Sequence, residues 1–152
     1  GISSGGNRAT MIYQNNLSCG VVGRTGVIMN ANASHYFTVQ FEVSGGNLAF
    51  AVDASGSNSQ TTEKLNTSLV REGSGSGNIF VFDFPQGTPS QGMNGVLEPG
   101  IYRFTANQVA SASSDGSLTN TASGSVTLEI GPPGTVQSNS LSRTEKKLSF
   151  WR

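Results

Sequence analysis

Apolar and polar residues alternate most strictly between His35 and Val43, in the stretch HYFTVQFEV. One parity contains only apolar residues: Phe37, Val39, Phe41 and Val43. The other parity contains Tyr36, Thr38, Gln40 and Glu42. Because side chains of a strand point alternately to its two faces, this pattern predicts a half-buried antiparallel strand with one wet face.

A second alternating run follows almost at once. In Leu48–Asp53 the larger apolar side chains occupy every second position, so Leu48, Phe50 and Val52 are expected to point inward. The intervening Ser44-Gly45-Gly46-Asn47 has the composition of a tight turn. The two runs therefore predict a β-hairpin.

The late part of the chain repeats this arrangement. Ile101–Ala106 and Ser125–Ile130 have strand-like patterns, and a Ser/Asn/Gly-rich stretch between them predicts a loop. Tyr102 and Phe104 share a parity and are expected in the core. The Gly131-Pro132-Pro133-Gly134 sequence predicts the end of the sheet, because proline cannot donate to a ladder.

Shorter strand-like runs complete the pattern: Ala9–Tyr13, Cys19–Met29 (a hairpin or a bulged strand), Leu65–Arg71 and Ile79–Phe84. Polar stretches between the runs predict a turn at Asn15-Asn16 and loops at Asn30–Ser34 and Ala54–Thr62. About eight or nine short strands separated by turns predict an all-β antiparallel sandwich or barrel. We expect the β-sandwich over residues 1–131 and a separate tail over 132–152.

The run Ile79–Phe84 is unusual because both of its faces are apolar. Phe80, Phe82 and Phe84 form one face, and Ile79 and Val81 lie on the other. A second apolar face predicts a covering element, the tail or another subunit. A homo-oligomer formed through Ile79, Val81 and the tail is therefore one expectation.

Composition and charge narrow the class of protein. The 152 residues suit one domain, and the charged fraction of 12% is about half that of an average globular protein. Abundant Gly, Ser, Thr and Asn with little charge is typical of extracellular or cell-surface β-domains. Residues 1–130 carry a net charge of −3 and residues 131–152 a net charge of +3, so the tail is basic. Nothing in this distribution favours nucleic acid, and no apolar run is long enough to span a membrane.

Candidate catalytic residues are sparse. His35 and Cys19 are the only residues of their types, and neither lies in a nucleophile motif. Cys19 is expected to be a small buried hydrophobe, and its being alone excludes an intrachain disulfide. Glu42 and Asp53 can both occupy the wet face of the predicted hairpin, but wet-face carboxylates are usually ordinary surface groups. We expect no enzyme and no cofactor; a structural calcium ion at Ser113–Ser117 or Asp53–Gly56 remains open.

Glycan recognition fits the wet face best. Apolar C–H faces of sugars stack on exposed aromatic rings, and sugar hydroxyls bond to planar polar groups. Tyr36 shares its face with Gln40 and Glu42, so these three residues are the candidate glycan contacts. The alternative is that Tyr36 is simply a rim residue with its hydroxyl in water.

The motif L-x-P-G-x-Y-x-F, formed by Leu97, Pro99, Gly100, Tyr102 and Phe104 and followed by V-x-L-x-I, resembles the late strands of secreted bacterial jelly-roll modules of the carbohydrate-binding type. The sequence PGIYRF also resembles a strand of C1q/TNF-like jelly rolls, although that strand comes early in those domains. The resemblance implies a jelly-roll sandwich and an extracellular location. The function that we expect is therefore a non-catalytic glycan-binding module, and the alternative is a self-assembling structural subunit.

Overall fold

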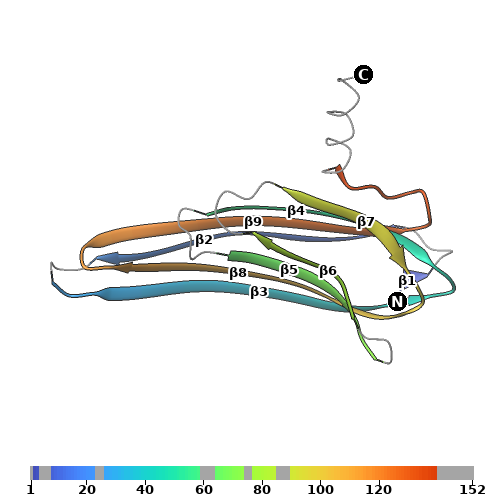
Figure 1. The fold of residues 1–152 in the computed structure, drawn as a ribbon, viewed down its shortest axis with the longest axis horizontal. Helices are drawn as coiled ribbons and strands as arrows, with labels where there is room; N and C mark the ends of the chain where they lie inside the picture. The colour runs from blue at the N-terminus through green and yellow to red at the C-terminus, as the bar shows by residue number, and fades with distance from the viewer. Residues whose placement is uncertain are drawn as a thin grey trace, which may run out of the picture.

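The computed structural model describes residues 2–3, 8–22, 26–58, 64–73, 77–84 and 90–139, and the part described is built from β-strands (Figure 1). The strands are β1 (Ile2–Ser3), β2 (Ala9–Val22), β3 (Met29–Ser44), β4 (Leu48–Asn58), β5 (Lys64–Arg71), β6 (Gly77–Phe84), β7 (Gln91–Leu97), β8 (Gly100–Ser114) and β9 (Ser117–Gly131). They form two sheets, with the orders β1-β3-β8-β5-β6 and β2-β9-β4-β7. The prediction of an all-β sandwich is confirmed.

The strand order is that of a jelly roll. β2 pairs with β9, β3 with β8, β4 with β7 and β5 with β6, all antiparallel, so that the chain winds as four nested pairs. Eight strands wound in this way give two four-stranded sheets packed face to face. The two-residue β1 adds a short parallel pairing to the end of β3.

Both predicted hairpins are wrong in their pairing. β3 and β4 are joined by a turn at Gly45 and Gly46, which have φ of 74° and 133°, but they belong to different sheets. β8 and β9 are likewise joined by a two-residue connection and lie in different sheets. Cys19–Met29 is also no hairpin or bulged strand, because β2 ends at Val22 in one sheet and β3 begins at Met29 in the other. Alternation shows which face of a strand is buried, but it does not show which neighbour the strand pairs with.

The core consists of two clusters. The larger cluster fills the wide half of the sandwich with Tyr102, Phe104, Phe50, Phe84 and other large side chains, and it confirms the predicted burial of Tyr102 and Phe104. The smaller cluster fills a narrow arm, into which β2, β3, β8 and β9 alone among the described strands continue (Figure 1). It contains mostly small residues: Cys19, Val21, Ala110, Ala112 and Ala122. Cys19 is a buried free thiol, as predicted.

The strands are much longer than predicted. The arm consists of small and polar residues, so its sequence did not show the alternation from which the strands were predicted. Asn15-Asn16 lies inside β2, Asn30–Ser34 inside β3, and the predicted Ala54–Thr62 loop starts inside β4, which ends at Asn58. The polar stretch between Ala106 and Ser125 is also almost entirely strand. Two ribbons that meet through alanine need few large apolar residues, so their sequence resembles a loop.

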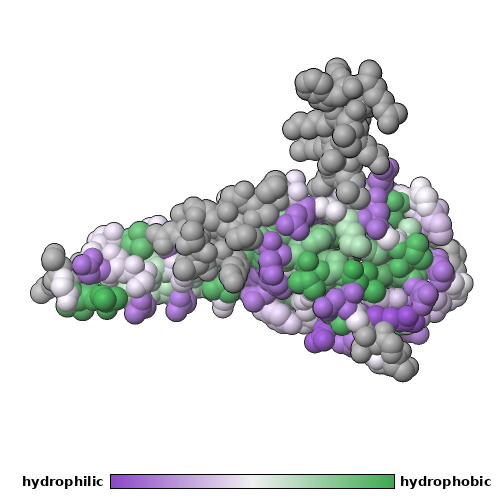
Figure 2. Space-filling model, in the orientation of Figure 1, coloured by the Kyte–Doolittle hydropathy of each residue, from purple (hydrophilic) through white to green (hydrophobic). Residues whose placement is uncertain are grey.

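β6 and β7 are the last strands of the two sheets on the same side of the sandwich. Phe80 and Phe84 point inward as predicted, whereas Val81 on the outer face is 47% exposed. Apolar side chains gather where β6 and β7 cross the wide half (Figure 2). Ile79, predicted on the same face as Val81, is partly buried and packs against the larger core cluster, and no element that covers Val81 is found within the described ranges.

Candidate functional site

Tyr36 lies on the outer face of β3 and is 61% exposed. Thr38, Gln40 and Glu42 are exposed on the same face, whereas Phe41 and Val43 are buried. The wet face predicted from the alternation is thus confirmed. It belongs to the sheet β3-β8-β5-β6, in which Tyr36 lies near the middle of the edge strand.

The pairing register places three more polar residues in line with Tyr36. Tyr36 is opposite Asn107 of β8, Asn107 is opposite Asn66 of β5, and Asn66 is opposite Asp83 of β6. Residues directly opposite one another point to the same face, so all four lie on the outer face of the sheet. We call this set the tyrosine row; with three strand spacings it is about 14 Å long.

The polar groups of the tyrosine row are held in defined positions. Asn66 Nδ2 donates to Asp83 Oδ1 at 2.6 Å, which fixes both side chains at one end. In the neighbouring line of residues, Ser68 Oγ and Thr105 Oγ1 are 2.7 Å apart. Within the described ranges, Asn107 has no side-chain hydrogen bond, so its amide is available in the centre of the row.

The two other predicted contacts lie along β3 rather than beside Tyr36. At about 3.3 Å per residue, Gln40 is about 13 Å and Glu42 about 20 Å from Tyr36. Gln40 Nε2 donates to Glu72 Oε2 at 2.5 Å, and Arg103 Nε lies 2.9 Å from Glu72 Oε1. The structure therefore confirms a shared face for the three residues but does not bring them together.

The sequence pattern does not reveal Asn107, Asn66 and Asp83 as partners of Tyr36, because alternation is a property of single strands. Each of the three occupies an outward position, which alternation alone can suggest. Their alignment with Tyr36 depends on β8, β5 and β6 being neighbours in that order. That order follows from the jelly-roll winding, which the local pattern does not specify.

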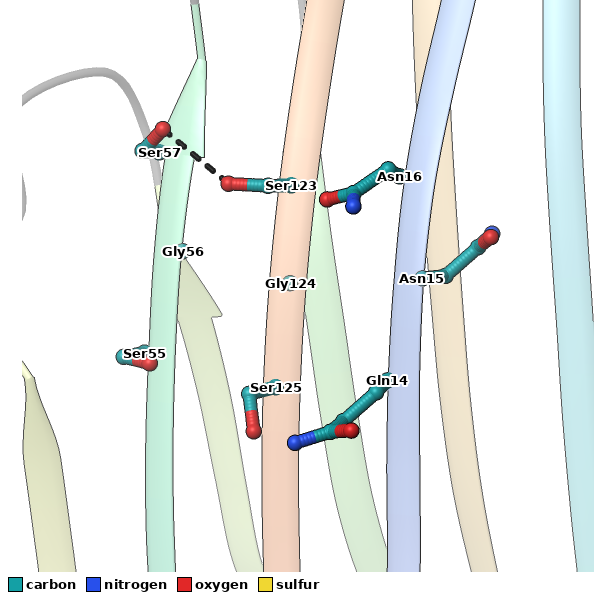
Figure 3. Close-up of a pocket in the computed structure, with 9 residues that line it drawn as sticks. All are labelled: Gln14, Asn15, Asn16, Ser55, Gly56, Ser57, Ser123, Gly124 and Ser125. Carbon is teal, nitrogen blue, oxygen red and sulfur yellow. Dashed lines mark hydrogen bonds between the residues drawn. The ribbon is translucent and has the colours of Figure 1, made fainter.

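A concave surface lies on the outer face of the other sheet (Figure 3). Its volume is about 620 Å³, and short segments of three neighbouring strands line it: 14–16 of β2, 123–125 of β9 and 55–57 of β4. A smaller depression of about 210 Å³ shares Ser55 and Ser125 with it and continues toward Asp53, Thr127 and Asn139. We call the two together the serine groove.

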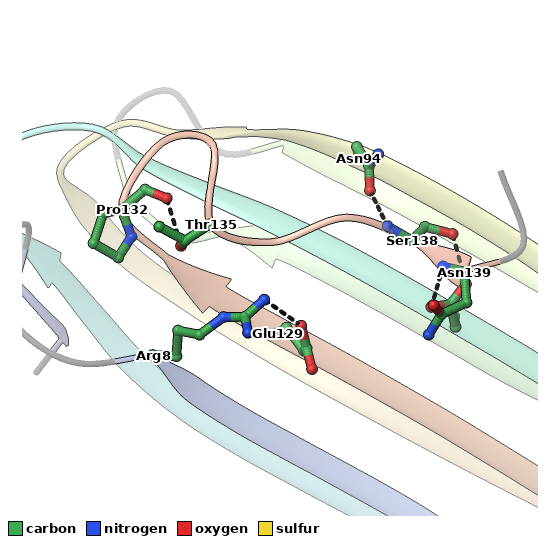
Figure 4. A network of polar contacts seen from close by, with 8 residues as sticks. Arg8, Asn94, Glu129, Pro132, Thr135, Ser138 and Asn139 are labelled. Atoms are coloured by element: carbon green, nitrogen blue, oxygen red, sulfur yellow. Dashed lines mark hydrogen bonds and ion pairs between the residues drawn. The ribbon is translucent and has the colours of Figure 1, made fainter. Parts of the chain in front are cut away.

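Asn139, in the segment that follows β9, lines the far end of the serine groove, and Figure 4 shows the polar contacts of this segment. Thr135 N and Oγ1 both donate to Pro132 O, which turns the chain back over the sheet. Ser138 Oγ and Asn139 N then donate to the two carboxylate oxygens of Asp53, at 2.5 and 2.9 Å. Ser138 N donates to Asn94 Oδ1 at 2.7 Å. The sequence 140–152, with most of the basic tail and Trp151, is outside the described residues.

The remaining candidate residues are scattered over the molecule. The rings of His35 and Tyr13 are 5.6 Å apart, and Cys19 is buried in the arm. Glu42 and Asp53 lie on different sheets, so the expectation of one shared wet face is wrong. Asp53 is inside β4, and Ser113–Ser117 spans the β8–β9 turn. In the described ranges no three His, Cys, Asp or Glu side chains cluster as metal ligands, and no helix is long and apolar enough to cross a membrane.

No protein-family model matches this chain, and no curated protein matches its sequence. Solved structures that resemble it include infectious bursal disease virus, Gx strain, with a TM-score of 0.38 and 12% identity over 84% of this chain and 34% of that chain. The Yersinia pseudotuberculosis-derived mitogen has a TM-score of 0.28 and 12% identity, covering 71% of this chain and 91% of the mitogen. The carbohydrate-binding module CBM4 has a TM-score of 0.26 and 12% identity, covering 72% and 78%.

The chain thus spans about a third of the length of the virus protein that it matches. Likenesses at this level establish neither a family nor a function. The jelly-roll assignment comes from the strand order of this chain itself.

Proposed function

We propose that this protein is a non-catalytic, extracellular glycan-binding module. The observation that carries the proposal is the tyrosine row, in which an exposed ring is aligned with two amides and a carboxylate across four paired strands. An extended sugar chain lying across the strands would stack on Tyr36 and bond to Asn107, Asn66 and Asp83 in turn. The low charge and Gly/Ser/Asn-rich composition support an extracellular location.

The chemistry of the row matches that of a neutral sugar chain. The Tyr36 ring is an apolar plate with a polar tip, so it suits the C–H face of a sugar. Amides can both donate and accept, and the carboxylate accepts, which matches vicinal hydroxyl groups. The strands are rigid supports, so little conformational entropy is lost when the face is occupied.

Substitutions in the row test this proposal on a panel of soluble polysaccharides in affinity electrophoresis, followed by calorimetry on the tightest binder. Tyr36→Ala is expected to weaken binding at least about tenfold, the effect of losing a central aromatic contact. Tyr36→Phe retains the stacking face and is expected to lose less. Asn107→Ala is expected to weaken binding without changing the unfolding temperature, because the amide has no side-chain partner in the described ranges.

Ile12→Ala is the matched control. Ile12 is 59% exposed, almost as much as Tyr36, but it lies on the outer face of the opposite sheet. It is expected to leave polysaccharide binding unchanged. Equal losses in Ile12→Ala and Tyr36→Ala, or no binding of any polysaccharide by the unmodified protein, would contradict the proposed function.

A second candidate function is self-assembly, and the apolar side of the sandwich favours it. Val81, Met93 and Val96 are 47%, 36% and 59% exposed on β6 and β7, the last strands of the two sheets. On the opposite side, β2 lacks both charged residues and proline, which commonly protect sheet edges from pairing with other strands. Self-association through Val81 and its neighbours is expected to give a concentration-dependent mass in sedimentation experiments. Val81→Lys should abolish it, whereas Thr119→Lys on the exposed face of the arm should not.

A further inference from the structure

We propose that the serine groove is a second binding site, and that its ligand is a neutral polyhydroxylated molecule such as a short oligosaccharide or a polyol. The groove lies on the sheet opposite the tyrosine row, so the two sites are physically separate. This ligand is independent of the proposed function of the tyrosine row, because it would be held by the polar side chains on β2, β9 and β4.

Two cross-strand lines of polar side chains form the groove. The first line is Gln14, Ser125 and Ser55, and the second is Asn16, Ser123 and Ser57. The lines are separated by two residues along each strand, about 7 Å, and neighbours within a line are about 5 Å apart. Six hydroxyl or amide groups are thus presented on one surface with regular spacing.

The line between these two faces the interior of the sandwich. Asn15, Gly124 and Gly56 pair with one another, and a Cβ at Gly124 would lie 3.1 Å from Leu65 Cδ2 and 3.3 Å from Gln108 Oε1. No side chain therefore rises between the two polar lines, and the space between them remains open (Figure 3). A ligand can lie on backbone and reach both lines.

Most of the polar groups of the groove are not used by the fold. Ser57 Oγ and Ser123 Oγ are 3.1 Å apart and bond to each other. Within the described ranges, the side chains of Gln14, Asn16, Ser55 and Ser125 have no hydrogen-bond partner. Hydroxyls and amides can each donate and accept, so these four groups can satisfy hydroxyls of either orientation on a ligand.

The electrostatics of the groove select a neutral ligand. Among the described residues no charged side chain lines the larger depression, so an anion or a cation would lose hydration there without gaining an opposite charge. Asp53 lies at the far end, but both of its carboxylate oxygens already accept hydrogen bonds from residues 138 and 139. The volume of about 620 Å³ is within the range of small-ligand sites.

The test is a titration of the ¹⁵N-labelled full chain with glucose, cellobiose, maltotriose and sorbitol, followed by amide chemical shifts. Binding is expected to shift the side-chain NH₂ signals of Gln14 and Asn16 and the backbone amides of Ser123 and Ser125. Ser125→Leu fills the groove and removes a hydroxyl, so it should raise the dissociation constant at least about tenfold. The matched control Thr119→Leu introduces the same side chain at an exposed position of β9 and should leave it unchanged.

The tests of the serine groove and of the tyrosine row have independent outcomes. Tyr36→Ala should leave the groove shifts intact, because Tyr36 lies on the other sheet. Absence of groove shifts with all four probes would overturn this inference and leave the tyrosine row untouched. Shifts that persist in a folded Ser125→Leu variant would also overturn it, and retention of the thermal midpoint and of the remaining amide spectrum establishes that this variant is folded.

Discussion

Tyr13 and Tyr102 are buried residues whose hydroxyl groups are in surroundings that disfavour ionisation. Burial raises the pKa of each above its ordinary value of 10.0. At Tyr102 the positive charge of Arg71 opposes the rise in pKa, and at Tyr13 a hydrogen bond from Asn15 does so. Tyr102 Oη also donates to Glu98 O at 2.8 Å, which ties β8 to the preceding turn.

These raised pKa values predict a loss of stability at alkaline pH. An unfolded tyrosine loses its proton near pH 10, whereas the folded one keeps it. The unfolded state therefore becomes more stable relative to the folded state as the pH rises. The contribution of the two tyrosines to the free energy of unfolding is fully present below pH 10. It disappears as the pH rises through the pKa that they have in the folded state. Denaturant unfolding at increasing pH should show a falling free energy from about pH 10. The Tyr102→Phe variant should have a lower free energy of unfolding at neutral pH, and this free energy should fall less steeply with rising pH. An unchanged slope would contradict the assignment of the alkaline loss to Tyr102.

Gly95 is needed because a side chain there would overlap a core ring. A Cβ at this position would lie 2.8 Å from Phe50 Cζ, and Phe50 is only 2% exposed. Gly95→Ala is therefore expected to lower the free energy of unfolding by about 1–3 kcal/mol, the usual effect of overpacking. Gly77→Ala is the matched control, since a Cβ there meets nothing within 4 Å. Chemical denaturation gives the free energy of unfolding of both variants. An equal decrease in the two would contradict the overlap of a side chain at position 95 with Phe50.

At this scale the sequence predicted which residues are buried but not their polar partners. Tyr102, Phe104 and Phe50 follow from alternation, and the exposure of Tyr36 follows as well. Ala51 does not: its position in β4 points outward, yet it is only 3% exposed. Its register partner Asn94 is bonded to Ser138, so the segment after β9 covers this place. Such a cover depends on a long-range contact that no local pattern contains.

The arm is the element that departs furthest from the sequence prediction. Its interior is filled by alanine and other small residues, which let two ribbons pack closely. Serine, alanine and asparagine have weak strand propensities, so the same residues looked like loops. The strands form because β2 and β9 continue a register already set in the wide half, from Ala9–Ile130 to Val22–Ser117. In the arm, the strand pairing that continues from the wide half outweighs the weak strand propensity of the residues.

A small core should make the arm sensitive to added volume. Ala122 is 1% exposed, so Ala122→Leu is expected to force the ribbons apart at a cost of about 1–3 kcal/mol. Because the clusters of the arm and the wide half are separate, local opening should be confined to the arm. Hydrogen exchange should become faster in residues 17–22 and 110–114 and remain unchanged in Leu48–Val52. Thr119→Leu, on the exposed face, should leave hydrogen exchange unchanged in both groups of residues. Equally faster exchange throughout the Ala122→Leu variant would contradict the separation of the two core clusters.

The whole molecule presents two different polar faces on one rigid sandwich. The tyrosine row lies on one outer face and the serine groove on the other, and the edge formed by β6 and β7, which carries Val81 on the face of the tyrosine row, joins the two. Such an arrangement would let one molecule hold a glycan chain on one face and a small hydroxylated ligand on the other. The sequence predicted the first face through Tyr36. It missed the second, since Ser55-Gly56-Ser57 and Asn15-Asn16 resembled turns.

Self-assembly makes a separate prediction at the same scale. If the apolar side joins two copies, Val81 and Met93 become buried in the assembly, and Val81→Lys should convert it to monomers. Polysaccharide binding should fall much less than in Tyr36→Ala, because Val81 pairs with Ser68 in the line next to the tyrosine row and is not one of its four residues. Sedimentation equilibrium and affinity electrophoresis on the same variant separate the two functions. A monomer at all concentrations in the unmodified protein would exclude assembly as a function.

The most direct test of the central claim is the footprint of a bound polysaccharide on the labelled protein. Amide chemical shifts should change along a line that crosses the sheet from Tyr36 through Asn107 and Asn66 to Asp83, including both asparagine NH₂ groups. The line follows from the register of β3, β8, β5 and β6 and from nothing else in the chain. Shifts confined to other surfaces, or spread evenly over the molecule, would show that the tyrosine row is not the glycan site.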